Sequence, residues 1–261
     1  TGALQSLPGD IKEAATVDGA SPARMWLHVT GPLLLIATAP VLVPFDLPMR
    51  VRFRGITRRR GVLVQGPAGW GEWSPFAEYV TPEIDPWWRC AREAAVEGWP
   101  AAVRSSVPVN VTIPAVSPLD AQARAAASGC STAKIKVAEP GQSAAEDEAR
   151  VEAVRDALGA SGRVRIDANG AWTVAEALRR LRSLARYGLE YAEQPCRSVE
   201  ELRELRLALA RAGVEVPIAA DESIRRSGDP ERVAALEAAD VAVLKVQPLG
   251  GVRACLALAE R

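Results

Sequence analysis

The 261 residues can build one large hydrophobic core or two modest ones. Because 32 lysines and arginines balance 32 aspartates and glutamates, no net field favours nucleic acid or an anionic membrane surface as a partner. The longest apolar run, residues 33–45, contains two prolines and is shorter than the roughly 20 residues of a membrane-spanning helix, so we expect no membrane crossing.

The few cysteines and the single histidine argue against disulfides, a Ser–His–Asp triad and a histidine-rich metal site. Cys90, Cys130, Cys196 and Cys255 are widely spaced and form no CxxC pair, which is typical of free thiols in a cytoplasmic protein. His28 is the only histidine, so a Ser–His–Asp triad or a histidine-rich metal site would have to be built around it. We expect neither.

Residues 1–37 differ in character from the rest of the chain. Asp10 followed by Glu13 predicts the start of a short helix, and Asp18-Gly19 ends it. The segment resembles the cytoplasmic EAA loop of ABC transporter permeases, which implies docking on an ATPase subunit. Two interpretations follow, an ordinary helical hairpin or a permease fragment joined to an unrelated protein.

Residues 44–106 predict a small α+β unit. Residues 49–55 alternate apolar residues with arginine, as a half-exposed strand does, and residues 61–67 predict a second strand. A tryptophan-rich helix is expected over residues 85–99, with its indole rings packed in the core.

Residues 107–261 alternate predicted strands with predicted helices. Such alternation is typical of a parallel α/β sheet. The expected strands cover 107–113, 132–137, 164–169, 189–194, 217–222 and 241–246, and the expected helices cover 118–128, 143–158, 173–187, 198–213 and 229–238.

Five charged residues recur in the last five of these strands, at intervals of 24 to 31 residues. They are Lys136, Asp167, Glu193, Asp221 and Lys245. Each interval is about one strand–helix–strand unit, and a parallel barrel brings the ends of such strands to one rim. Three carboxylates there suit a hard cation, Mg²⁺ with Mn²⁺ as the alternative, and the lack of histidine or cysteine disfavours zinc.

Three basic residues need separate explanations. Lys134 and Lys136 lie two residues apart and therefore face the same side of a strand, where Lys134 is either a substrate contact or an exposed rim residue. Lys245 interrupts an apolar run typical of a strand buried on both faces. Arg165 lies on the same strand face as Asp167 and either contacts substrate or forms a structural ion pair.

The motifs KIK, DAN, EQP, DES and LKV resemble the enolase superfamily, in particular its muconate lactonizing subgroup. The resemblance runs from about Phe45 to the last residue. It implies an α/β fold, with an enolase-like capping α+β domain on a modified TIM barrel. It also implies a small-molecule carboxylate substrate, with Mg²⁺ on Asp167, Glu193 and Asp221.

The implied reaction is loss of water from 2-succinyl-6-hydroxycyclohexa-2,4-diene-1-carboxylate, a step of menaquinone biosynthesis. The resemblance implies that Lys136 removes the α-proton and that Lys245 stabilises the enediolate from the opposite side. N-succinylamino acid racemisation, dipeptide epimerisation and cycloisomerisation begin with the same proton abstraction and remain alternatives. Only about six of eight barrel strands are countable, so we expect the chain alone to lack appreciable activity.

Overall fold

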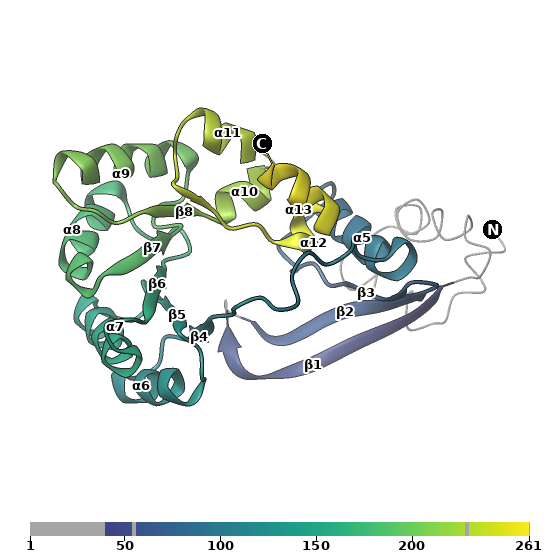
Figure 1. The fold of residues 1–261 in the computed structure, drawn as a ribbon, viewed down its shortest axis with the longest axis horizontal. Helices are drawn as coiled ribbons and strands as arrows, with labels where there is room; N and C mark the ends of the chain where they lie inside the picture. Colours follow the sequence, from purple (N-terminus) through teal and green to yellow (C-terminus); the bar gives the residue numbers. More distant parts are fainter. Residues whose placement is uncertain (1–39, 54–55, 228–229, 261) are drawn as a thin grey trace. The chain divides into compact units, whose positions relative to one another are not determined.

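The computed structural model of the protein describes residues 40–53, 56–227 and 230–260. The chain divides into two compact units (Figure 1). Unit 1 takes the residues up to Val103 together with Lys245 onward, and unit 2 is Arg104–Leu244. The helical segment predicted over residues 1–37 lies outside the described residues.

Unit 1 contains an antiparallel sheet of order β1-β2-β3. The strands are β1 (Val41–Phe53), β2 (Ile56–Gly66) and β3 (Gly69–Trp73). The two predicted strands are present, but β1 begins earlier than expected and takes in Pro44 and Pro48. Prolines are tolerated there because β1 lies at the edge of the sheet and, among the described residues, pairs only with β2.

One helical segment packs on this sheet. It consists of α5 (Asp85–Arg92) and the wider π-helical turn η2 (Glu93–Glu97), so the predicted helix is confirmed up to Glu97. Ala91 and Ala95 pack with Val64 in a small core. A Cβ atom on Gly71 would lie 2.0 Å from the carbonyl oxygen of Ala91, so the close approach of helix and sheet requires glycine there.

Two C-terminal helices complete unit 1, α12 (Val246–Leu249) and α13 (Val252–Ala259). The Glu93 carboxylate accepts hydrogen bonds from the backbone N–H of Val252 (2.7 Å) and of Arg253 (3.2 Å), which satisfies the first turn of α13. Residues 245–260 cluster with unit 1, and the predicted domain boundaries of 44–106 and 107–261 stay a prediction.

Unit 2 is built on a six-stranded parallel sheet of order β4-β5-β6-β7-β8-β9, which confirms the six predicted strands. Helices α6 to α9 lie along one side of the curved sheet, as in a partial barrel (Figure 1). The strands are β4 (Val111–Ile113), β5 (Thr132–Lys136), β6 (Arg163–Asp167), β7 (Leu189–Glu193), β8 (Ile218–Ala220) and β9 (Val241–Ala242).

Local capping signals determine where the helices of unit 2 begin. Ser143 and Ser198 form reciprocal capping boxes with Glu146 and Glu201. The helix α10 directly follows β8 and was not predicted. The helices are α6 (Pro118–Ala127), α7 (Ala144–Leu158), α8 (Val174–Leu184) with the 3₁₀ turn η3 (Ala185–Tyr187), α9 (Val199–Arg211), α10 (Glu222–Ser227) and α11 (Pro230–Ala235).

Alternate residues of the central strands divide between two environments. Ile135 and Ile166 are fully buried, as are Val151 and Leu181 of the helices. The neighbours of Ile135 on β5 are Lys134 and Lys136, and those of Ile166 on β6 are Arg165 and Asp167. These four side chains face the other side of the sheet. No helix in the described part of the chain is long and apolar enough to cross a bilayer.

Candidate active site

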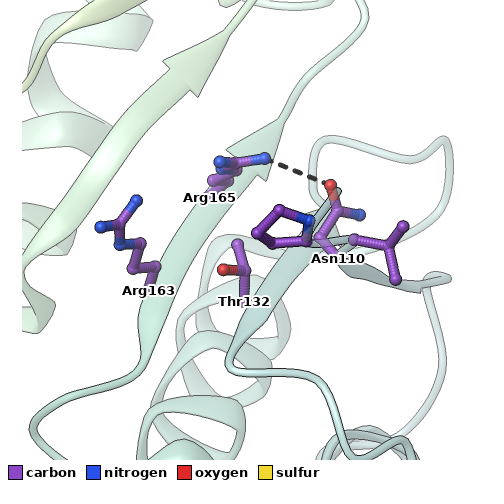
Figure 2. A pocket seen from close by; sticks show the side chains of 6 residues that line it. Asn110, Thr132, Arg163 and Arg165 are labelled. Carbon is purple, nitrogen blue, oxygen red and sulfur yellow. Dashed lines mark hydrogen bonds between the residues drawn. The ribbon is translucent and has the colours of Figure 1, made fainter. Parts of the chain in front are cut away.

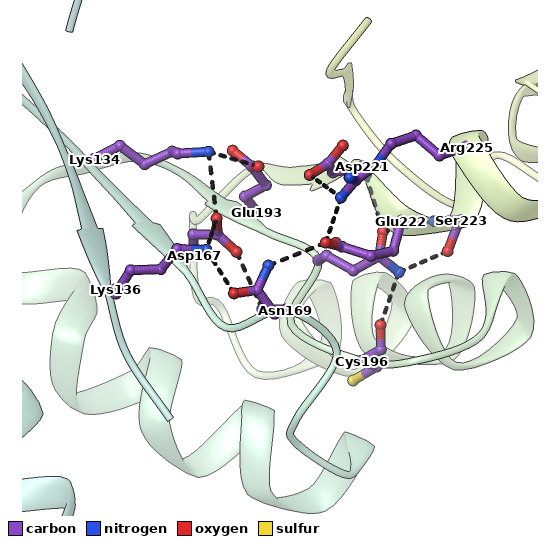
Figure 3. A network of polar contacts seen from close by, with 11 residues as sticks. Lys134, Lys136, Asp167, Asn169, Glu193, Cys196, Asp221, Glu222, Ser223 and Arg225 are labelled. Carbon is purple, nitrogen blue, oxygen red and sulfur yellow. Dashed lines mark hydrogen bonds and ion pairs between the residues drawn. The ribbon is translucent and has the colours of Figure 1, made fainter. Parts of the chain in front are cut away.

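Strand register aligns three of the five predicted charged residues. Lys136 pairs with Asp167, Asp167 pairs with Glu193, and Glu193 pairs with Ala219 on β8. Asp221 follows β8 directly. These side chains gather at the carboxyl ends of β5 to β8 (Figure 3), as the barrel spacing predicted.

Two lysines contact the first two carboxylates. Lys136 Nζ lies 2.6 Å from Asp167 Oδ2 and 2.5 Å from Asn169 Oδ1. Lys134 Nζ lies 2.8 Å from Glu193 Oε1 and 3.3 Å from Asp167 Oδ2. Since one ammonium group bridges Asp167 and Glu193, these carboxylates are close enough to share a cation (Figure 3).

Burial and neighbouring charges perturb these groups in different directions. Burial raises the pKa of Glu193, and the nearby charge of Asp167 raises it further, to about 7 despite Lys134. Burial acts the same way on Asp167, but Lys136 and Lys134 outweigh it and hold that pKa below its ordinary value. For Lys134, the two carboxylates outweigh burial and raise the pKa. The buried carboxylate of Glu193 is therefore the easier of the two to protonate.

Asp221 belongs to a second polar group at the start of α10. Its side chain is buried and pairs with Arg225 at 2.8 Å. Arg225 also pairs with Glu222, which accepts a 3.0 Å hydrogen bond from Asn169 Nδ2. Sequence reasoning gave no role to Asn169, Glu222 or Arg225, although the first two lie in the DAN and DES motifs and Arg225 lies one turn further on.

The donor set suits a hard cation. Glu193 Oε2 is buried and has no hydrogen-bond partner within the described residues, so one carboxylate oxygen is available for a ligand. The charge of the carboxylates is balanced in this structure by Lys134, Lys136 and Arg225. Among the described residues, no three acidic, histidine or cysteine side chains lie close enough together to hold a single ion. Asp167, Glu193 and Asp221 nevertheless supply only oxygen donors, which Mg²⁺ prefers.

Arg165 forms the structural ion pair that the sequence left as one alternative. Its Nε lies 2.5 Å from Glu190, and its guanidinium stacks over the Tyr191 ring at 4.9 Å. Its Nη1 lies 3.2 Å from Asn110 (Figure 2). Val164 pairs with Leu189 and Arg165 with Tyr191, so Glu190 is the extra residue of a β-bulge.

A cavity of about 420 Å³ lies beside Arg165, toward the amino ends of the strands and away from Asp167. Figure 2 shows four of the side chains that line it, Asn110, Thr132, Arg163 and Arg165. Substrate contact by Arg165 stays a prediction.

The apolar residues around Lys245 predicted a strand buried on both faces. This prediction is wrong, because Lys245 lies outside any strand of the described residues. The strand β9 covers only Val241–Ala242, and Lys245 is the half-buried residue that precedes α12 in unit 1. The reason is that β9 pairs with β8 alone within the described sheet, so the apolar residues after Ala242 have no second strand to pair with.

Two protein-family models match the chain. The enolase N-terminal domain-like family covers residues 44–95, and the enolase C-terminal domain-like family covers residues 119–261. These matches give no support to the permease resemblance of residues 1–37.

Two similar curated proteins are both named o-succinylbenzoate synthase. The chain is 64% identical over 216 residues to an o-succinylbenzoate synthase of Thermobifida fusca, covering 83% of this chain and 67% of the relative. It is 55% identical over 215 residues to an o-succinylbenzoate synthase of Mycolicibacterium smegmatis, covering 82% and 64%. The chain thus spans about two thirds of the length of these relatives.

Solved structures share the fold at lower identity. An o-succinylbenzoate synthase of Thermosynechococcus elongatus, complexed with Mg in the active site, is 23% identical with a TM-score of 0.64, covering 85% of this chain and 80% of that one. The L-Ala-D/L-Glu epimerase of Bacillus subtilis is 21% identical with a TM-score of 0.70, covering 87% and 79%. The chain therefore belongs to the enolase superfamily and, within it, to the o-succinylbenzoate synthases.

Proposed function

We propose that this chain carries the active site of a dehydratase that converts 2-succinyl-6-hydroxycyclohexa-2,4-diene-1-carboxylate to 2-succinylbenzoate. The observation that carries the proposal is the contact of Lys136 Nζ with Asp167 Oδ2 at 2.6 Å, at the rim where three buried carboxylates gather. A buried amine beside oxygen ligands for a divalent cation suits removal of a proton next to a substrate carboxylate.

We assign Mg²⁺, with Mn²⁺ as the alternative, to Asp167, Glu193 and Asp221. The bound ion would offset the second negative charge that develops on the substrate carboxylate when the α-proton leaves. Lys134 bridges Asp167 and Glu193, which supports a role in holding these two ligands together rather than in direct substrate contact.

Lys136 Nζ receives the α-proton in this scheme. The C–H electron pair stays on the substrate, the ring C–O bond then breaks, and Nζ returns the proton to the departing hydroxide to form water. Asp167 Oδ2 and Asn169 Oδ1 orient Nζ, and the Lys136 side chain is 5% exposed, which keeps bulk water from the transferred proton. We give Lys245 the second, electrostatic role that the family resemblance implies.

A chimera tests the proposal directly. The aligned residues of this chain replace their counterparts in the Thermobifida fusca relative, and the products are followed with the dehydratase substrate and with N-succinyl amino acids. We expect 2-succinylbenzoate to form. A racemised amino acid with no dehydration would instead assign the chain to the racemases and overturn the proposal.

Substitutions in the same chimera assign the base. Lys136→Ala should lower dehydration by at least about a thousandfold, as expected for loss of a general base. Lys136→Arg should fail as well, because a guanidinium stays protonated. Mg²⁺ affinity, measured by calorimetry, should persist in both. Substantial turnover by either variant would move the role to Lys245 or Lys134, and Lys245→Ala and Lys134→Ala then distinguish the two.

A further inference from the structure

Gln194 joins the strand ends that carry the three carboxylates. We propose that it is a positioning residue that holds Asp221 in place relative to Glu193 and thereby sets the affinity for a divalent cation. This inference rests on the metal assignment in the proposed function. Gln194 follows Glu193 directly, its side chain is fully buried, and its φ of 38° lies in the left-handed region.

The side-chain amide uses its full hydrogen-bonding capacity. Oε1 accepts hydrogen bonds from the backbone N–H of Asp221 (2.9 Å) and of Ser223 (3.1 Å). Nε2 donates to the Cys196 carbonyl oxygen (2.9 Å) and to Ser223 Oγ (2.6 Å). A glutamine amide can accept two and donate two hydrogen bonds, so every site is engaged.

The backbone of Gln194 extends the connection to the two neighbouring strands. Its N–H donates to the carbonyl oxygen of Ala219 on β8 at 2.7 Å, and its carbonyl oxygen accepts from Gly170, just beyond β6, at 2.7 Å. Gly170 has a φ of 73° and lies against the backbone of Arg197, so it allows this close approach. One residue therefore links the ends of β6, β7 and β8.

The amide's position explains why it should affect the metal. The two backbone groups that Oε1 binds flank the turn on which the Asp221 carboxylate is carried, and both are buried. Without an acceptor they would be unsatisfied, so the turn would shift to find other partners. Carboxylate ligands must be held within about 0.5 Å of their productive position, and loss of an outer partner typically weakens metal binding by about 10- to 100-fold.

The test measures Mg²⁺ binding by calorimetry on the 261-residue chain and needs no turnover. Gln194→Met keeps the volume but removes the acceptor, and we expect the Kd to rise by at least about tenfold. Gln194→Asn is a second variant, in case Gln194→Met does not fold. It keeps a buried amide, but the asparagine side chain is too short to reach the Asp221 N–H, so its Mg²⁺ Kd should rise by a similar factor. Ser223→Ala removes one acceptor of Nε2 but keeps both backbone N–H groups that Oε1 binds, so its Kd should rise less than that of Gln194→Met.

Val154→Ala is the matched control. Val154 is fully buried on α7 and has no hydrogen-bonding side chain, so its loss lowers the melting temperature without touching the carboxylates. Its Mg²⁺ affinity should equal that of the parent. If the parent binds Mg²⁺ and both Gln194 variants bind it within twofold of the parent, the positioning role is wrong. If the parent itself binds no Mg²⁺, the metal assignment fails and this inference falls with it.

Discussion

Lys134 and Lys136 explain how acidic residues can be buried side by side at the strand ends. Asp167 and Glu193 are almost completely buried, and an isolated buried carboxylate is costly. The two ammonium groups offset that cost, but incompletely, since burial and the charge of Asp167 still raise the pKa of Glu193 to about 7. A divalent cation would complete the neutralisation, and Glu193 Oε2, which no lysine of the described residues contacts, is the oxygen left for it.

The contribution of a single carboxylate to metal binding can be measured at Asp221. Asp221→Asn should raise the Mg²⁺ Kd by at least about a hundredfold, above the loss typical of an outer-shell partner, because a neutral amide leaves the ion under-neutralised. Calorimetry on the chain checks this. Asp156→Asn makes the same charge change on an exposed position of α7 and should leave the Kd unchanged. Equal affinity in Asp221→Asn and the parent would remove Asp221 from the ligand set.

The raised pKa of Glu193 predicts how Mg²⁺ stabilisation depends on pH. A carboxyl group whose pKa rises on folding, here from 4.5 to about 7, binds its proton more tightly in the folded state. The metal-free protein therefore loses this contribution to stability as pH rises from about 4.5 through 7. Below a pH of about 7, Mg²⁺ must displace the proton that Glu193 carries in the folded state. The increase in melting temperature caused by Mg²⁺ should be larger at pH 8 than at pH 5.5.

The control for this pH effect is Glu193→Gln, which has no proton to displace. In that variant the response to Mg²⁺ should be weak and nearly the same at both pH values. An equal shift of melting temperature at pH 5.5 and pH 8 in the parent would contradict a Glu193 that is protonated at the lower pH.

At the scale of elements, the helices of unit 2 begin where short polar signals place them. Ser198 accepts from the backbone N–H of Glu201, whose carboxylate accepts from the N–H of Ser198 at 2.9 Å. This box starts α9, the helix that follows β7 and the EQP motif. The capping box therefore also fixes the end of the segment that connects Glu193 to α9.

Ser198→Ala should lower the free energy of unfolding by about 1 kcal/mol, because the first turn of α9 loses a side-chain acceptor. Urea denaturation followed by circular dichroism measures the change. Ser161→Ala, in an exposed turn, is the matched control and should have no measurable effect. If the two variants unfold at the same urea concentration, the capping box does not stabilise the helix.

At the scale of the whole molecule, the four free cysteines report separately on the two units. Burial raises the pKa of Cys196 in unit 2 to about 12 and that of Cys90 in unit 1 to about 11, and it raises the pKa of Cys255 as well. Cys130 is half-buried. A thiol reacts as its thiolate, so buried thiols with raised pKa should react slowly.

Iodoacetamide at pH 8, with the modified peptides quantified by mass spectrometry, should label Cys130 first. Cys196, Cys90 and Cys255 should react only when their unit unfolds, so increasing urea should expose Cys90 and Cys255 of unit 1 together and Cys196 when unit 2 unfolds. Labelling of Cys196 as fast as Cys130 without denaturant would show that the core of unit 2 opens readily.

The sequence alone determined the parallel α/β architecture and the carboxylate rim. The repeated strand–helix pattern predicted six strands, and the spacing of Asp167, Glu193 and Asp221 predicted that these residues lie at the ends of neighbouring strands, on one edge of the sheet. Both conclusions hold because parallel strands joined by helices must end at a common edge, whatever the details of packing. Capping by Ser198 is likewise local, since the interacting groups lie within one turn of each other.

Tertiary structure decided the partners that sequence cannot specify. Arg165 pairs with Glu190 because a bulge between β6 and β7 turns an extra residue toward it. Residues 245–261 join unit 1 because Glu93, more than 150 positions earlier, satisfies the first turn of α13. Gln194, at the end of β7, accepts a hydrogen bond from the backbone N–H of Asp221, at the end of β8. Each contact joins residues distant in sequence, and the geometry that brings them together exists only once the sheets and helices have packed.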